Sequence, residues 1–193
     1  MTQAEIKQLI QKQRTFFHSD ATLDVEYRIH ALQKLKACIL KYENEINIAI
    51  RADLGKCAFE SYMCETGLVL SELTYMLKHT RKFSKERTVR TPLAQFHSKS
   101  YQKPSPYGVT LIMSPWNYPF MLTIEPLIDA LAAGNTAILK PSAYSAHTTA
   151  LISRMIQECF DEKYVAVVTG GREENNFLLN EHFDYTFFTG SQE

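Results

Sequence analysis

The feature of this sequence that most constrains its fold is a change in hydrophobic pattern at Tyr107. After this residue, short and mostly apolar runs without a regular polar alternation are separated by stretches of helical spacing. A strand buried on both faces shows no polar alternation, and a repeated strand–helix–strand order predicts a parallel sheet with right-handed crossovers. Ser145 is expected to cap the second of the intervening helices. We expect strands over 109–113, 136–140, 164–168 and 185–188, and helices over 120–133, 145–160 and 173–180.

Residues 1–90 carry apolar side chains at steps of three and four, which is typical of amphipathic helices. We expect one helix near the N-terminus, one long helix over 25–50 that ends towards Gly55, and a third from residue 69. Basic residues gather at the end of the third helix, and Thr91-Pro92 breaks it. Three parts follow from this pattern: a helical part over 1–90, an extended arm or linker over 91–106, and a sheet unit over 107–193.

The charge balance gives no electrostatic argument for binding nucleic acid or an anionic membrane surface. The 193 residues include 21 Lys plus Arg and 21 Asp plus Glu, a formal net charge of +0. No apolar run reaches the roughly 18 residues of a membrane span, and the N-terminus lacks signal-peptide regions. The four cysteines fit no zinc spacing, so we expect no metal. We therefore expect a cytoplasmic protein with no membrane segment and no nucleic-acid partner.

The residues that follow the four strands are the candidates for chemistry, because ligands of parallel sheets bind beyond the carboxyl ends of the strands. Asn117 lies in the first of these loops, Ser114–Pro119, between two prolines. A held amide donor stabilises an oxyanion that develops during attack on a carbonyl. An asparagine in such a loop equally well satisfies the loop's own backbone groups, so the residue alone leaves both roles open.

The other three strand ends carry a lysine and several glycines. Lys140 ends a buried strand before a proline, where it can hold a ribose hydroxyl or a phosphate, or simply leave the sheet. Gly170, Gly171 and Gly190 allow a ligand to approach the backbone closely, and they are equally normal turn residues. The sequence contains no GxGxxG, so the usual dinucleotide fingerprint is absent.

Taken together and in order, these segments resemble the aldehyde dehydrogenase family. The resemblance covers essentially the whole chain, and Ala52–Lys56 with the short N-terminus resembles the class 3 branch, which handles fatty and aromatic aldehydes. It implies an N-terminal portion of an NAD(P)-dependent enzyme that oxidises aldehydes to carboxylates, with an incomplete, doubly wound, Rossmann-like sheet over 107–193. The segments that carry it are Ser114–Pro119, Ala132–Thr136 before Leu139–Ser142, Val167–Gly171 and Phe187–Ser191.

The resemblance also implies a role for each candidate residue. Asn117 matches the oxyanion-stabilising residue, and Lys140 matches the lysine that contacts the adenosine ribose. The remaining implied contacts with NAD or NADP are Ser114, Pro115 and Trp116 along the cofactor groove, Ser142 beside Lys140, Gly170 and Gly171 near the adenine, and Gly190 and Ser191 at the pyrophosphate. The implied partners are an aldehyde substrate and, in the intact enzyme, a second subunit of a homodimer.

Two departures from the family pattern qualify this interpretation. The family's nucleophilic cysteine and general-base glutamate lie beyond Ser191, and the four cysteines here fall in other segments, so we expect the catalytic domain to be absent and the chain alone to be inactive. Ala143 stands where many members carry a ribose-binding glutamate, which predicts a preference relaxed towards NADP. A non-catalytic nucleotide-binding or subunit-pairing fragment stays open as an alternative. A third alternative is a related enzyme with another reaction, such as an acyl-phosphate or semialdehyde reductase. The segment Trp116–Pro119 favours an aldehyde dehydrogenase over it.

Overall fold

The structure is a computed structural model that describes residues 1–191, so the last two residues of the predicted sheet unit lie outside it. A parallel sheet of four strands, in the order β5-β4-β3-β6, forms the centre of the body. The strands confirm the predicted parallel α/β fold, and β3 and β4 are buried at every position, as their uninterrupted apolar runs indicated. The strands are β3 (Val109–Met113), β4 (Thr136–Lys140), β5 (Val165–Val167) and β6 (Tyr185–Phe188).

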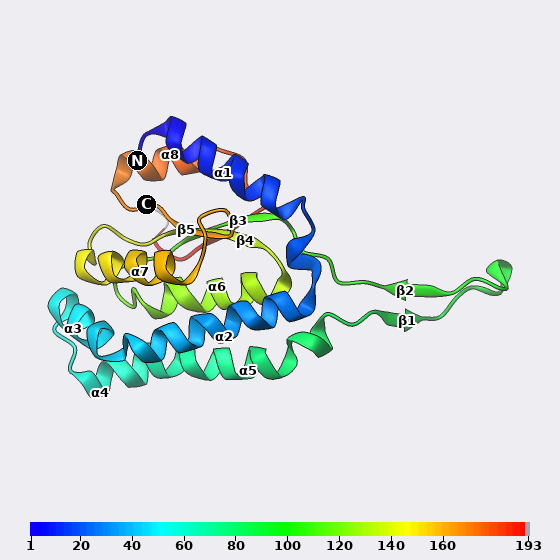
Figure 1. Cartoon of the computed structure of the whole chain (residues 1–193), viewed down its shortest axis with the longest axis horizontal. Coiled ribbons are helices and arrows are strands. Elements are labelled where there is room, and N and C mark those ends of the chain that lie inside the picture. The colour runs from blue at the N-terminus through cyan, green and yellow to red at the C-terminus, as the bar shows by residue number, and fades with distance from the viewer. Residues whose placement is uncertain (192–193) are drawn as a thin grey trace.

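Helices cover both faces of this sheet (Figure 1). Alternate side chains of β3 enter different cores: Ile112 packs in the core beneath α6 and α7, whereas Leu111 and Met113 pack in the core beneath α1 and α8. The first segment of the chain therefore belongs to the sheet as one of its covering helices. The covering helices are α6 (Met121–Ala133), α7 (Ala146–Cys159), α1 (Gln3–Phe17) and α8 (Arg172–Leu179).

A third layer of helices packs on α6 and α7, on the side away from the sheet (Figure 1). Its apolar side chains join the larger of the two cores, which also holds most buried residues of α6 and α7. Within residues 1–191, no helix is long and apolar enough to cross a lipid bilayer. The elements of this layer are η1 (Ala21–Leu23), α2 (Val25–Lys41), α3 (Glu43–Leu54), α4 (Ala58–Ser61), the π-helical turn η2 (Tyr62–Thr66) and α5 (Gly67–Phe83).

The prediction of one long helix over 25–50 is wrong, because the chain breaks at Tyr42, with φ −98° and ψ 8°. The Tyr42 hydroxyl donates to the Glu158 carboxylate of α7 at 2.6 Å. The break lets α2 follow α5 and α6 while α3 turns onto α7. Apolar spacing continues across the break, so periodicity alone does not reveal it. The predicted end of this segment is confirmed, since Gly55 caps α3 with φ 72°.

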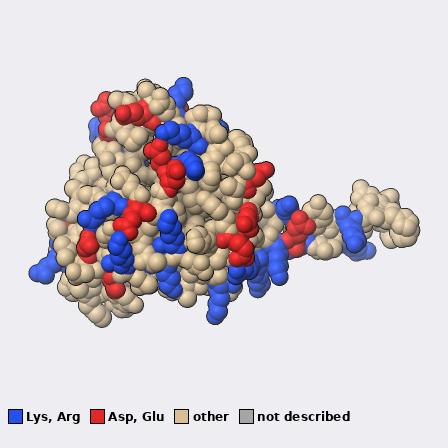
Figure 2. All heavy atoms as spheres, viewed as in Figure 1, with Lys and Arg blue, Asp and Glu red and all other residues tan. Residues whose placement is uncertain are grey.

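The extended arm is a β-hairpin that begins earlier than predicted. Helix α5 ends at Phe83, and β1 (Arg87–Val89) pairs antiparallel with β2 (Ser100–Gln102) through the short helix η3 (Leu93–Gln95). The hairpin projects away from the body (Figure 1). Lys and Arg side chains gather where α5 passes into the arm (Figure 2), and Arg81 there pairs with the exposed Glu26 of α2.

The predicted cap of α7 is also wrong. Ser145 occupies the N-cap position, but its hydroxyl donates to the Ser142 carbonyl instead of accepting from the helix. Asp53, at the end of α3, accepts from the backbone N–H groups of His147 at 3.0 Å and Thr148 at 2.7 Å. A carboxylate can accept from two N–H groups of the first helical turn, and its negative charge is favoured by the positive end of the helix dipole. A hydroxyl carries no such charge. The cap therefore comes from an element more than ninety residues earlier in the chain.

Candidate functional site

The loops that follow β3, β4 and β6 lie side by side at the carboxyl edge of the sheet. The backbone N–H of Ser114 donates to the Lys140 carbonyl at 3.3 Å, and the N–H of Thr189 donates to the Met113 carbonyl at 3.0 Å. The strand order also reverses at β3, since β4 and β5 lie on one side of it and β6 on the other. This reversal is where doubly wound sheets form their ligand crevice.

The loop Ser114–Pro119 is anchored at its two ends and exposed in its middle. The hydroxyl of Thr123, in α6, donates to the Pro119 carbonyl at 2.6 Å, so the Ser114 hydroxyl donates to the Thr123 oxygen at 2.5 Å. Ser114 is buried, whereas Trp116 is 53% exposed and Asn117 is exposed. The Ser114 side chain therefore serves the loop itself, while the Asn117 amide is presented to the outside.

A buried ion pair supports this loop from the helical layer. The carboxylate of Glu65, in η2, is 0% exposed, and Lys56 approaches it to 2.6 Å. The same carboxylate accepts from the Phe120 N–H at 2.9 Å, and Lys56 donates to the Asn117 carbonyl at 3.0 Å. We did not predict either residue as part of a site. Lys56 lies in a segment that resembles the family, but no local pattern connects it with a loop sixty-one residues away.

Lys140 is buried at the end of β4, with 3% of its surface exposed. Its ammonium donates to the carbonyls of Pro141 at 3.1 Å and Gly170 at 2.8 Å. These bonds use two of its three protons, and they hold the group between the loops after β4 and β5. Burial lowers the pKa of Lys140, while the carboxylate of Glu174 acts in the opposite direction.

The predicted glycines lie in two different environments. Gly170 has φ +130°, and a Cβ there would clash with the Glu174 carboxylate. That carboxylate accepts from the Gly171 N–H at 2.8 Å, so it occupies the N-terminus of α8. A Cβ at Gly190 would meet the far edge of the exposed Phe188 ring at 2.7 Å, so a larger residue there requires that ring to move.

The remaining predicted residues lie nearer the surface. Pro115 is half-buried in the loop after β3, and Ser191 is exposed at the last described position. Ser142 is half-buried in the turn that leads to α7, where its carbonyl accepts from the Thr149 hydroxyl at 2.9 Å. Ala143 next to it is exposed. Among residues 1–191, no three His, Cys, Asp or Glu side chains group as a metal site requires.

The four cysteines are free thiols, and two of them lie deep in the protein. Cys38 of α2 and Cys159 of α7 are buried in the larger core, where the Cys38 sulfur lies 3.7 Å from the Met155 carbonyl. The hydrogen bond with Cys38 and burial both raise the pKa of Cys159. Since the thiolate is the nucleophile, the raised pKa makes Cys159 unsuited to covalent catalysis. Cys57 is exposed and Cys64 is partly exposed.

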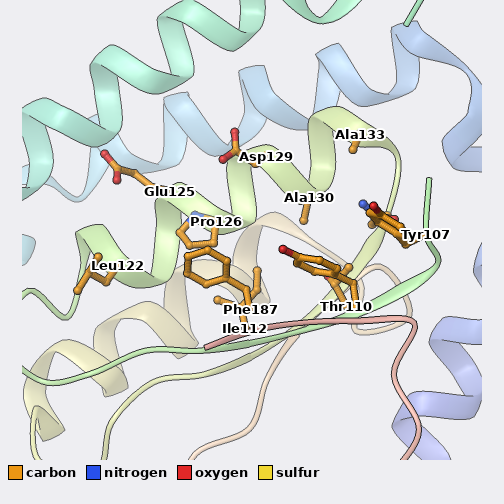
Figure 3. A pocket seen from close by; sticks show the side chains of 12 residues that line it. Tyr107, Thr110, Ile112, Leu122, Glu125, Pro126, Asp129, Ala130, Ala133 and Phe187 are labelled. Atoms are coloured by element: carbon orange, nitrogen blue, oxygen red, sulfur yellow. The ribbon is translucent and has the colours of Figure 1, made fainter. Parts of the chain in front are cut away.

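A groove of about 350 Å³ runs beside α6, away from the predicted strand-end site (Figure 3). It was not predicted. The sheet supplies an apolar floor that includes Ile112 and Phe187, and Figure 3 shows the carboxylates of Glu125 and Asp129 pointing away from it. Burial, followed by the charge of Glu72, raises the pKa of Asp129 to about 6. The lining residues are Tyr107, Thr110, Ile112, Leu122, Glu125, Pro126, Asp129, Ala130, Ala133, Asn135, Tyr185 and Phe187.

Several known proteins are similar to this chain in both sequence and fold. The chain is 44% identical over 187 residues to the 4,4'-diaponeurosporen-aldehyde dehydrogenase of Staphylococcus aureus, covering 97% of this chain and 41% of that protein. It is 35% identical to the dimeric NADP-preferring aldehyde dehydrogenase of Canis lupus familiaris, covering 97% of this chain and 42% of that one. The substrate-bound structure of Staphylococcus aureus AldH superposes with a TM-score of 0.94 at 44% identity, over 96% of this chain and 41% of that one.

The chain thus spans about two fifths of the length of the relatives it matches. The aldehyde dehydrogenase family matches residues 1–193 of this chain. The strand-end loops that first suggested the family are the ones that the fold brings to one edge of the sheet. The chain belongs to the aldehyde dehydrogenase family.

Proposed function

We propose that this chain forms the nucleotide-binding part of an NAD(P)-dependent aldehyde dehydrogenase that oxidises aldehydes to carboxylates. The observation that carries the proposal is the meeting of the loops after β3, β4 and β6 at the reversal of the strand order. We assign the exposed Asn117 and the ammonium of Lys140 to the ligand crevice expected at this reversal. Bound NAD(P) supplies the hydride acceptor there.

The contacts of these residues support a division of roles. The Asn117 amide donates to the oxyanion that forms when a nucleophile attacks the aldehyde. The third proton of Lys140, with Ser142 beside it, serves the ribose. Because Glu174 already fills the N-terminus of α8, the pyrophosphate is assigned to the loop of Gly190 and Ser191 instead. The cofactor groove is completed by Ser114, Pro115 and Trp116, with Gly170 and Gly171 near the adenine.

Calorimetric titration of the chain with NAD⁺ and with NADP⁺ tests this assignment. We expect saturable binding of both, because the exposed Ala143 brings no carboxylate to repel a 2′-phosphate. The NADP-preferring relative supports the same expectation. Lys140→Met is expected to weaken binding, while the matched variant Lys36→Met, on the far side of α2, is not. Absence of saturable binding, or strong exclusion of NADP⁺, contradicts the assignment.

We propose that the substrate of the intact enzyme is a fatty or other long apolar aldehyde. The proposal is supported by the resemblance of Ala52–Lys56 to the class 3 branch, and one relative is named a 4,4'-diaponeurosporen-aldehyde dehydrogenase. A larger kcat/KM for long-chain than for short-chain aldehydes in the intact enzyme is the expected result.

The projecting hairpin, and a relative named as dimeric, support a homodimer of the intact enzyme. A cytoplasmic location stays a prediction from the sequence.

The alternative is a non-catalytic module that binds nucleotide or pairs with an intact subunit. Reading the coding DNA beyond the codon for Glu193 separates the two: a continuing frame with a cysteine in an aldehyde dehydrogenase context supports the enzyme. We expect the 193-residue chain alone to form no NADH from an aldehyde, because its cysteines do not match the family nucleophile. Steady NADH formation by the purified chain contradicts this expectation.

A further inference from the structure

We propose that Lys56 and Glu65 are positioning residues that hold the Asn117 loop in the geometry its amide needs. The inference rests on the proposed function for the meaning of Asn117, but its physical content is independent. It states that a buried ion pair of the helical layer fixes the backbone of a loop on the sheet. Neither residue touches the reacting atoms, and each acts through the Asn117 loop.

Glu65 holds the end of the loop where α6 begins. Its Oε2 atom accepts from the N–H groups of Phe120 at 2.9 Å and Met121 at 3.4 Å. These N–H groups lie at the helix N-terminus, where Phe120 is the N-cap residue and offers no side-chain bond. A carboxylate at this position satisfies those donors and is favoured by the helix dipole.

Lys56 holds the middle of the same loop. Its Nζ atom donates to the Asn117 carbonyl at 3.0 Å and lies 4.1 Å from the centre of the Tyr118 ring. The same atom pairs with Glu65 Oε1 at 2.6 Å. One ammonium therefore joins the fully buried carboxylate to the residue whose amide is exposed.

A helix cap alone does not account for this arrangement. A cap requires only Glu65, and a buried carboxylate requires only one countercharge. Lys56 adds a bond to the Asn117 carbonyl and a contact with the next ring, and both fall on the residues that present the amide. Peptide planarity then transmits the constraint, because fixing a carbonyl fixes the plane that follows it. Glu65 also lies in a π-helical turn, a distortion that occurs frequently at functional sites.

The chain carries its own reporter of the loop, because Trp116 is its single tryptophan and precedes Asn117. The experiment measures the fluorescence anisotropy and acrylamide quenching of Trp116, together with hydrogen exchange at the Phe120 amide. It compares Lys56→Met, Lys56→Arg and Glu65→Gln with the unchanged chain. Lys36→Met is the matched control, since Lys36 bonds Thr74 on the helical layer far from the loop.

We expect lower anisotropy and stronger quenching of Trp116 in Lys56→Met and Glu65→Gln, with Lys56→Arg restoring both. In Glu65→Gln the Phe120 amide is expected to exchange about tenfold faster, because a neutral amide oxygen is a weaker acceptor than a carboxylate. Amides of β4 are expected to keep their exchange rates. Unchanged Trp116 signals overturn the proposal, as does acceleration at Phe120 that matches the acceleration in β4, because that result is general destabilisation.

Failure of this inference is distinguishable from failure of the proposed function. The loop measurements need neither nucleotide nor aldehyde, so their outcome does not depend on what Asn117 does. The role of Asn117 is measured separately, as a kcat about a hundredfold lower in Asn117→Ala of the intact enzyme. If the loop measurements follow the expectation but Asn117→Ala leaves kcat unchanged, the proposed role of Asn117 is wrong. The proposal that Lys56 and Glu65 hold the loop then still stands.

Discussion

The sheet body and the β1–β2 hairpin differ in what holds them together. In the body, β3 and β4 are buried at every position and lie between two cores. In the hairpin, all three residues of β1 are exposed, and the tip carries Leu93 at 88% and Phe96 at 77% exposure. The body is therefore stabilised by buried apolar side chains. The described hairpin is held by the backbone hydrogen bonds between β1 and β2 and by a few side-chain hydrogen bonds.

The difference identifies the hairpin as the region that burial within this chain stabilises least. A two-stranded hairpin is marginal in water by itself, and this one pairs only three residues of each strand. Exposed apolar side chains at the tip of such an arm gain free energy when another surface covers them. The proposed homodimer offers such a surface. Mutations in the body are therefore expected to lower stability more than mutations in the arm.

The largest contrast is expected from truncating a leucine in each region. Leu127→Ala, in the core face of α6 at 0% exposure, is expected to lower the free energy of unfolding by about 2–5 kcal/mol. Leu93→Ala, the same change at 88% exposure, is expected to change it by less than about 0.5 kcal/mol. Urea denaturation measures both, and equal losses contradict the division into body and arm.

Removing one polar anchor from each region gives a smaller contrast. Asp53→Ala leaves two N–H groups of α7 without their carboxylate and is expected to cost about 1–2 kcal/mol. Thr91→Ala removes the hydroxyl that accepts from the Ser100 N–H in the hairpin, at 3.0 Å, and is expected to cost less because water replaces it. Thermal unfolding of the two variants tests the order. If Thr91→Ala lowers the melting temperature more than Asp53→Ala does, the hairpin contributes to the stability of the body.

The groove beside α6 contains a titrating side chain, Asp129, whose charge state gives a pH test of the body. The pKa of Asp129 is raised from 3.8 to about 6, so the folded state favours the protonated carboxyl. Stability from this group is present at low pH and is lost as pH rises through 6. Asp129→Asn is therefore expected to stabilise the chain above pH 6. The gain is expected to be less than about 1 kcal/mol, because Asp129 is only partly desolvated and its exposed surface lets solvent screen the charge.

Melting temperatures of Asp129→Asn and the unchanged chain across this pH range measure the effect. The difference is expected to shrink as pH falls from 6 towards 4. A difference that is independent of pH shows that the substitution acts through packing.

The smallest effect on stability is expected at the tip of the arm, with a change in assembly instead. Leu93→Asp combined with Phe96→Asp adds charge at two exposed positions and is expected to leave the melting temperature nearly unchanged. In the intact enzyme the same double variant is expected to shift sedimentation from dimer towards monomer, because a charge is costly in an apolar contact. An unchanged dimer excludes the tip from the interface.

Much of the sheet was predictable because its signals are local. The apolar runs at Val109–Met113 and Thr136–Lys140 correspond to β3 and β4 without a shift, and Gly134 ends α6 as a glycine with positive φ does. The break at Tyr42 was missed because apolar spacing is the same on both sides of it. The start of the hairpin was missed because the end of α5 carries no proline or glycine near Ser84.

The sequence by itself determined the strands and helices of the sheet unit and the parallel direction of its strands. It also determined the family and the candidate residues at the strand ends. Only the tertiary structure decided what supports those residues: the cap of α7 by Asp53, the carboxylate of Glu174 at α8, and the clamp of Lys56 and Glu65 on the Asn117 loop. The physical reason is the range of each interaction. Backbone preference and hydrophobic period act between near neighbours in the chain, whereas a buried charge takes its partners from whatever the fold brings within hydrogen-bonding distance.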